Sequence, residues 1–133
     1  KCEYMNKEVK KKRRNNKAAG NRIELYFLKK LEDIHKQKLF TTRNISTLSD
    51  AKKNDIDNEF LNLPVKYQIK QSINNPNYSQ ILTEMSNNYK EYINVIAHQK
   101  TAKKGDKFYK VDDYVIMKFS DYEKIIKAYL ESL

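Results

Sequence analysis

The fold is decided by one stretch, which runs from Asp55 to Gln71 and reads DIDNEFLNLPVKYQIKQ. Short strands are expected around its two ends, at residues 54–58 and 65–71, and Pro64 marks the turn between them. Side chains along the second strand alternate between the two faces of a sheet, so one face packs and the other is available for chemistry. The two sets are Val65, Tyr67 and Ile69, and Lys66, Gln68 and Lys70.

The sequence before this stretch predicts one helix and one strand. Residues 18–34 carry apolar side chains at three- or four-residue spacing, which is typical of an amphipathic helix. Glu24 lies beside that stripe, at the edge of the core. A first strand is expected at residues 39–42, followed by a polar loop through Ser49. The apolar stripe consists of Ile23, Phe27, Leu31 and Ile34.

The sequence after this stretch predicts a helix, a strand and a hairpin. Pro76 is well placed near the first turn of the helix, whose apolar stripe is Tyr78, Ile81, Leu82 and Met85. Residues 92–97 form the most hydrophobic strand, which we expect at the centre of the sheet. Residues 107–111 and 114–119 suggest a hairpin around Asp112 and Asp113.

A last helix completes the predicted α/β order of helix, three strands, helix, strand, hairpin and helix. Ser120 is expected to cap this last helix, and Glu123 would complete a capping box. Its buried side is expected to consist of Ile125, Ile126, Tyr129, Leu130 and Leu133.

The size and charge of the chain limit its partners. Its 133 residues are enough for one domain with a modest core, and we expect a basic N-terminal arm over residues 1–17 and a single domain over residues 18–133. The formal net charge of +10 suits a polyanion, because phosphate contacts by Lys and Arg release counterions. No apolar run approaches the roughly 18 residues that span a bilayer, so no membrane partner is expected.

Cysteine and histidine are too scarce for several classes of site. Cys2 is the single cysteine, which excludes an intramolecular disulfide and a cysteine-based zinc site. This usage favours an intracellular, reducing compartment, either the cytoplasm or the nucleoid. The two histidines form no Ser/His/Asp pattern, and the two glycines offer no phosphate-binding loop.

The order of elements and three short motifs resemble the PD-(D/E)xK nuclease superfamily. The motifs are Gly20-Asn21-Arg22-Ile23-Glu24, Asp55-Ile56 and Gln68-Ile69-Lys70. The resemblance covers residues 17–97 and is most specific for the small Holliday junction resolvases of archaeal type and their phage-encoded relatives. It implies a restriction-endonuclease-like core of helix, three-stranded meander, helix and strand, extended here by a C-terminal hairpin and helix.

The resemblance also implies a metal site and a catalytic lysine. Glu24 and Asp55 would hold Mg²⁺, for which Mn²⁺ can substitute, together with the Gln68 amide oxygen and the Ile69 carbonyl oxygen. These are the oxygen ligands that Mg²⁺ prefers. Lys70 would hold the attacking water or steady the phosphorus atom.

Two features depart from the superfamily pattern. Gln68 stands where a carboxylate is usual, which removes one negative charge and weakens metal binding. Asp57 lies on the same strand face as Asp55 and either compensates for that charge or is a solvated acid at the strand end. In addition, Leu25 follows Glu24 where archaeal members carry a basic residue.

The expected DNA contacts are basic side chains outside the metal site. Arg43 matches a catalytically important arginine at the end of the first strand of these resolvases, and it is also expected to contact phosphate. His98 ends the hydrophobic strand, where it would touch phosphate or solvent or act as a base. The remaining expected contacts are Lys10, Lys11, Lys12, Arg13, Arg14, Arg22 and Lys100.

The resemblance predicts a metal-dependent, structure-specific DNA endonuclease that acts on branched DNA such as a four-way junction. Symmetric cutting of a junction needs two active sites, so a two-fold homodimer is expected. A phage-encoded protein of this kind would act in the host cytoplasm. The alternative, favoured by Gln68, is a catalytically weak or inactive DNA-binding or architectural protein of the same fold. A ribosome-associated basic protein is a third possibility, and it predicts RNA preference without a metal requirement.

Overall fold

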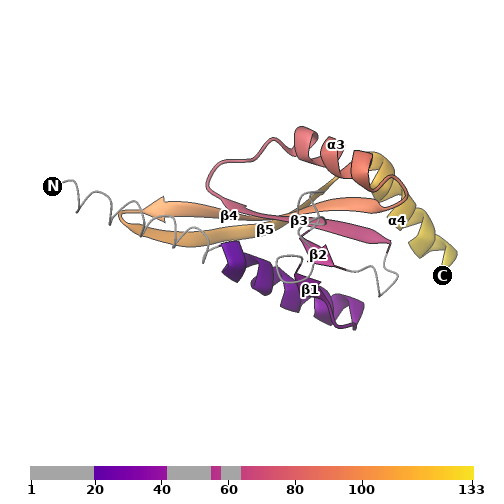
Figure 1. The fold of residues 1–133 in the computed structure, drawn as a ribbon, viewed down its shortest axis with the longest axis horizontal. Coiled ribbons are helices and arrows are strands. Elements are labelled where there is room, and N and C mark those ends of the chain that lie inside the picture. The colour runs from indigo at the N-terminus through magenta and orange to yellow at the C-terminus, as the bar shows by residue number, and fades with distance from the viewer. Residues whose placement is uncertain (1–19, 42–54, 58–63) are drawn as a thin grey trace.

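A computed structural model describes residues 20–41, 55–57 and 64–133 of the chain. These residues form three helices and a mixed three-stranded sheet with a further two-stranded ladder, so the described part of the protein is α/β (Figure 1). The elements are a helix over residues 20–35, β1 (Phe40–Thr41), β2 (Ile56–Asp57), β3 (Val65–Ser72), α3 (Tyr78–Asn88), β4 (Ile93–Lys104), β5 (Lys107–Met117) and α4 (Phe119–Glu131).

The main sheet has the strand order β3-β4-β5, with β4 in the centre. β3 and β4 are parallel, from Val65 beside Ile93 to Ser72 beside Lys100, and α3 forms the crossover that parallel strands need. β5 runs antiparallel to β4. The most hydrophobic strand is therefore central, as the sequence predicts, and it extends well beyond the predicted residues 92–97.

A two-stranded ladder lies beside the edge strand β3. β1 and β2 are antiparallel, with Phe40 beside Asp57 and Thr41 beside Ile56. The backbone N–H of Asp55, just before β2, donates to the Tyr67 carbonyl of β3 over 2.7 Å. The predicted order of helix, three strands, helix and strand is therefore present in the described residues.

Different helices cover the two faces of the main sheet (Figure 1). The helix of residues 20–35 packs its apolar side on one face, which includes Ile69 and Val95. On the other face, Met85 of α3 packs against Ile96 of β4. Fully burying one such side chain contributes about 1.5–3 kcal/mol, so these two cores hold the helices to the sheet.

The two predicted helical stripes are confirmed except at the end of the first. The first three residues of the earlier stripe are buried, but Ile34 is 72% exposed. The last turn of that helix meets the sheet through His35 instead, whose Nε2 lies 2.8 Å from Tyr67 Oη. In the α3 region all four predicted residues join the core. Asn77 caps this helix by accepting from the Gln80 N–H, so Pro76 precedes the first turn.

The predicted turn at Asp112 and Asp113 is wrong. Both residues lie inside β5, and the hairpin turns earlier, at Gly105 and Asp106, which join β4 directly to β5. Gly105 has a φ of +63°. Two-residue hairpin turns need a positive φ at their first residue, and glycine adopts it without strain. Asp113 is held within the sheet because its Oδ1 accepts from Gln99 Nε2 over 3.0 Å.

The predicted cap and buried side of the last helix are also wrong. α4 begins at Phe119 with Lys118 as its N-cap, so Ser120 and Glu123 form no capping box. Asp121 is the one buried residue of α4, all of whose residues are described, and its Oδ2 accepts from the Asn94 N–H of β4. The helix therefore contacts the sheet through its first turn. Its exposed apolar side chains are Phe119, Tyr122, Ile125, Ile126, Tyr129 and Leu130, with Leu133 just beyond.

Candidate active site

A cavity of about 730 Å³ opens at the carboxyl end of β3. Asp55, just before β2, binds Tyr67 and Ile69 of β3, and the cavity extends along β3 from Ile69 onward. Its walls come from three separate parts of the chain, the start of the helix of residues 20–35, the end of β3, and the β4–β5 hairpin. The lining residues are Gly20, Arg22, Ile23, Glu24, Ile69, Lys70, Gln71, Ser72, Ile73, Asn74, Thr101 and Phe108.

Asp55 is fixed against the edge of β3 by two hydrogen bonds. Its N–H donates to the Tyr67 carbonyl, and its Oδ2 accepts from the Ile69 N–H, each over 2.7 Å. Gln68 lies between these two partners in the sequence. Asp55 is 4% exposed, so its carboxylate is buried and held in one orientation by these bonds.

Gln68 is a buried amide on the α3 side of the sheet. Its register partner in β4 is Ile96, which packs against α3. The residue is 7% exposed, and within the described part of the chain its Oε1 is a buried acceptor without a hydrogen-bond partner. A buried acceptor in that state costs about 1–3 kcal/mol. Such a cost is tolerated where another group satisfies the atom during function.

The expectation of an open polar face on β3 is wrong. Lys66, on the same face as Gln68, is 1% exposed, and its Nζ lies 4.8 Å and 4.6 Å from the ring centroids of Tyr89 and Tyr92. Both faces of β3 are therefore covered along most of its length. Access to the strand is at its carboxyl end, where Lys70 is half-buried.

The structure brings most of the predicted site residues together. Glu24, Ile69 and Lys70 line the same cavity, and Glu24 is 4% exposed. Asp55 binds the Ile69 N–H next to this cavity without itself lining it. Gln68 is not brought to the others, because its side chain lies on the α3 face of the sheet, opposite the helix that carries Glu24. Within the described ranges, no three His, Cys, Asp or Glu side chains form a metal-binding group. The candidate metal site therefore depends on two carboxylates and on neutral oxygens.

The predicted DNA contacts are only partly described. Arg22 is exposed and lines the cavity, and Lys100 is half-buried on β4. Arg43 and the basic run at residues 10–14 lie outside the described residues. For Asp57, the backbone in β2 is described but its side chain is not, so both predicted roles, compensating acid and solvated strand-end acid, stay predictions.

The expectation that His98 touches phosphate or solvent is wrong. His98 lies in the middle of β4 and has no exposed surface. Its Nδ1 is 2.8 Å from Tyr78 Oη, and its Nε2 is 2.9 Å from Ser72 Oγ, which also donates to the Asn74 carbonyl. The histidine thus ties α3 to the end of β3 beside the cavity. His98 is not at a strand end, because β4 continues six residues past it.

The free energy of unfolding is expected to decrease as the pH falls below 6.5. Burial lowers the pKa of His98 from its ordinary value of 6.5. The unfolded chain keeps the ordinary pKa, so it binds the proton first, and stability is lost between that pH and the lower folded pKa.

Thermal unfolding at about pH 5 and about pH 7.5 checks this linkage. His98→Gln should show a smaller stability difference between the two pH values than the wild type. His35→Gln is the matched comparison, because burial also lowers the pKa of His35. A His98→Gln protein that retains the full wild-type difference would contradict this role.

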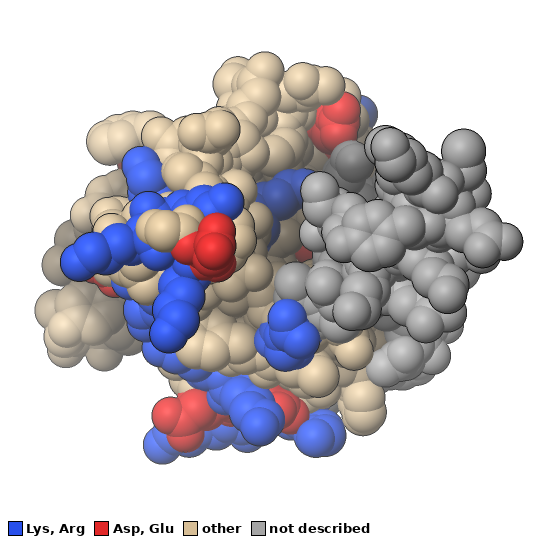
Figure 2. Space-filling view, turned by 90° about the vertical axis from the view of Figure 1, so that its left-hand side faces the viewer, with Lys and Arg blue, Asp and Glu red and all other residues tan. Residues whose placement is uncertain are grey.

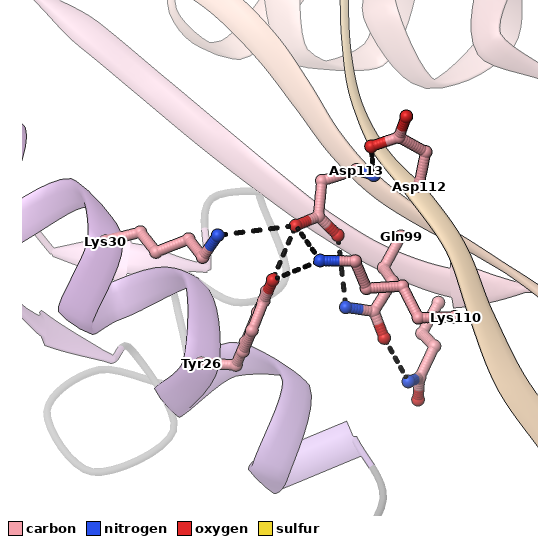
Figure 3. A network of polar contacts seen from close by, with 7 residues as sticks. Tyr26, Lys30, Gln99, Lys110, Asp112 and Asp113 are labelled. Carbon is pink, nitrogen blue, oxygen red and sulfur yellow. Dashed lines mark hydrogen bonds and ion pairs between the residues drawn. The ribbon is translucent and has the colours of Figure 1, made fainter.

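A polar network that the sequence does not reveal connects the hairpin to the helix of residues 20–35 (Figure 3). Tyr26 Oη donates to Asp113 Oδ2 over 2.5 Å, and Lys30 and Lys110 lie 3.6 Å and 3.3 Å from the same oxygen. Burial opposes ionisation of Asp113, but the hydrogen bonds from Tyr26, Gln99 and Lys110 lower its pKa overall. Tyr26 and Asp113 are 87 positions apart, so no local pattern indicates their contact.

Basic side chains gather on the end of the molecule that carries the hairpin tip (Figure 2). Lys103, Lys104, Lys107 and Lys110 of the hairpin are exposed.

No protein-family model matches the chain, and no match was found among the curated proteins or the solved structures. Among the residues that the structure describes, no helix is both long enough and apolar enough to cross a membrane.

Proposed function

We propose that the protein is a metal-dependent, structure-specific DNA endonuclease that acts on branched DNA, such as a four-way (Holliday) junction. The observation that carries this proposal is the cavity at the end of β3, where Glu24, Ile69 and Lys70 meet and where Asp55 binds the Ile69 backbone. The order of the elements supports it, because helix, three strands, helix and strand is also the order of the restriction-endonuclease-like core.

The available donor atoms fit a magnesium ion. Mg²⁺ prefers oxygen ligands and keeps several waters, so the carboxylates of Glu24 and Asp55 need only a few neutral oxygens beside them. The Ile69 carbonyl at the cavity is such an oxygen. The unsatisfied Gln68 Oε1 is not counted with it, because Gln68 points to the α3 face of the sheet, opposite the helix that carries Glu24. Mn²⁺ accepts the same ligand type. A bound ion of this kind polarises a phosphate oxygen and makes a water a stronger nucleophile.

The residues of the chain would position the reacting groups around that ion. Lys70 lines the cavity together with Glu24, and we propose that its ammonium group reaches the scissile phosphate. There it would hold the attacking water or stabilise the charge that develops in the transition state. Asp55 is already oriented by the Ile69 N–H, so its carboxylate needs little rearrangement before the reaction.

The basic surface would bind the phosphate backbone of the DNA. The net charge of +10 favours polyanions, and Arg22 lies at the mouth of the cavity. We propose that residues 10–14 and Arg43 add further phosphate contacts. Contacts of this kind carry no base information, so selectivity for branched DNA would come from its shape.

A two-fold dimer is part of this proposal, because two strands of a junction must be cut at related positions. The apolar side chains on β5 and α4 would give a second copy a surface to bury. Val115 is 62% exposed, Tyr129 is 62% exposed and Leu130 is 60% exposed. Contiguous exposed apolar patches often mark surfaces that bind another protein.

Cleavage of an end-labelled four-way junction tests the proposed function. We expect the wild type to cut paired positions on opposing strands in Mg²⁺ or Mn²⁺, and EDTA to stop the reaction. Lys70→Ala should lower the cleavage rate by about 100-fold or more, as expected for removing one transition-state donor. Lys90→Ala, an exposed lysine between α3 and β4 that does not line the cavity, is the matched control and should cut at the wild-type rate.

The second candidate is a DNA-binding or architectural protein that keeps this fold without cutting. The amide of Gln68 in place of a carboxylate favours it, because a neutral ligand binds Mg²⁺ more weakly. Tight junction binding without any cutting in Mg²⁺ or Mn²⁺ would support this candidate. Preference for RNA with no metal dependence would instead support a ribosome-associated role.

A further inference from the structure

The β4–β5 hairpin places an exposed aromatic ring at the wall of the candidate active site. Phe108 is 63% exposed and nevertheless lines the cavity together with Glu24 and Lys70. The Nζ of Lys103 lies 5.6 Å from the centroid of the Phe108 ring. A phenyl ring with this exposure is costly in water, and a flat ligand that stacks on it would remove that cost.

The strand register places the cationic and aromatic groups on defined faces of the hairpin. Lys103 pairs with Phe108, and both lie on the face that carries Asp113 and the helix of residues 20–35, which is the cavity side. Lys104 and Lys107 pair at the tip, on the opposite face. The tip therefore carries ammonium groups on both faces of the hairpin, and Lys103 shares the face of the aromatic ring.

The base of the hairpin is anchored, so its tip is held over the cavity. Asp113 accepts hydrogen bonds from Tyr26 of the helix, from Gln99 of β4 and from Lys110 of β5 (Figure 3). These contacts join both strands of the hairpin to the helix that carries Glu24. The position of Phe108 relative to the cavity is consequently set before any ligand binds.

We propose that this hairpin binds unpaired nucleotides next to the scissile phosphate. Phe108 stacks on an unpaired base, while Lys103, on the same face of the hairpin, contacts the flanking phosphate. A base inside a continuous duplex has both faces covered by its neighbours, so only an unstacked base offers the ring a partner. The inference rests on the proposed function and specifies its substrate as DNA that is open at the cleavage point.

Fluorescence anisotropy in EDTA tests this binding without cleavage. The probes are a labelled single-stranded oligonucleotide and a fully paired duplex of the same sequence, at one fixed salt concentration. Phe108→Ala should weaken binding of the single strand by about 5- to 150-fold, the range for losing one base–aromatic stack. Binding of the duplex should change by less than about 2-fold, because phosphate contacts dominate there.

Tyr109→Ala is the matched control, since Tyr109 is a 52% exposed aromatic residue next in sequence that pairs with Ala102 on the other face of the hairpin. It should leave binding of both probes unchanged. Equal losses for the single strand and the duplex in Phe108→Ala, or the same loss in Tyr109→Ala, would overturn the proposal. Because Phe108 is exposed, thermal unfolding should confirm that its variant remains folded.

The outcomes also separate this inference from the proposed function. If Phe108→Ala loses single-strand binding but the wild type never cuts a junction, the hairpin site is supported and the nuclease proposal is rejected. If the wild type cuts junctions in Mg²⁺ but Phe108→Ala binds single strands as well as the wild type does, the nuclease proposal is supported and the hairpin site is rejected.

Discussion

Asp55→Asn is expected to lower Mg²⁺-dependent cleavage of a four-way junction by about 1,000-fold or more. The substitution keeps the size of the side chain and its ability to accept the hydrogen bond from the Ile69 N–H. It removes one negative charge from a site in which Gln68 already replaces a carboxylate. Among the described residues, Glu24 would then be the one carboxylate that remains at the candidate metal site.

Single-turnover cleavage at saturating protein concentration measures this effect, and junction binding in EDTA is measured in parallel. Binding should remain within a few-fold of the wild type, because the basic surface is unchanged. Asp33→Asn, an exposed acid on the helix of residues 20–35, is the control and should cleave normally. Cleavage by Asp55→Asn at the wild-type rate would remove Asp55 from the proposed metal site.

Lys66→Glu is expected to lower the free energy of unfolding by about 3–5 kcal/mol. Lys66 is 1% exposed, and its ammonium group lies within 4.8 Å of two tyrosine ring centroids. The faces of aromatic rings are electronegative, so they stabilise a cation and repel an anion. A carboxylate at this position would be buried against both rings.

Lys66→Met separates the effect of charge from that of packing. Methionine keeps a long unbranched side chain and should cost no more than about 1–2 kcal/mol. Urea denaturation followed by circular dichroism gives the free energy of unfolding of both variants. Equal stabilities for Lys66→Glu and Lys66→Met would show that the buried charge does not matter to the fold.

Much of the secondary structure follows from local periodicity. The spacing of Ile23, Phe27 and Leu31 correctly predicts a helix that packs on the sheet, and the stripe that includes Met85 correctly predicts α3. The hydrophobic run at residues 92–97 correctly predicts the central strand. These predictions succeed because each depends on residues within a few turns or one strand of each other.

The candidate site was predictable in its members but not in its geometry. The motif residues Glu24, Ile69 and Lys70 can be read from the sequence, whereas the cavity they share depends on how the helix of residues 20–35 lies across the end of β3. The hydrogen bond from Ile69 to Asp55 depends on β2 lying beside β3. The metal, the substrate and the activity stay predictions that the experiments above address.

The errors arise where distant segments decide an outcome. The pair Asp112 and Asp113 has the composition of a turn, but Gln99 and Tyr26 bind Asp113 inside the sheet and the turn moves to Gly105. The apolar spacing of α4 predicts a buried side, but the helix contacts the sheet through its first turn and leaves that side exposed.

The sequence alone determined the order of helices and strands, the apolar side of the first two helices and the basic character of the chain. The tertiary structure decided which faces of β3 are covered, that Lys66 and His98 are buried, and that Phe108 lies at the cavity with Glu24. The reason is physical, because periodicity depends on neighbours along the chain. Burial and pairing depend on segments that meet only after folding.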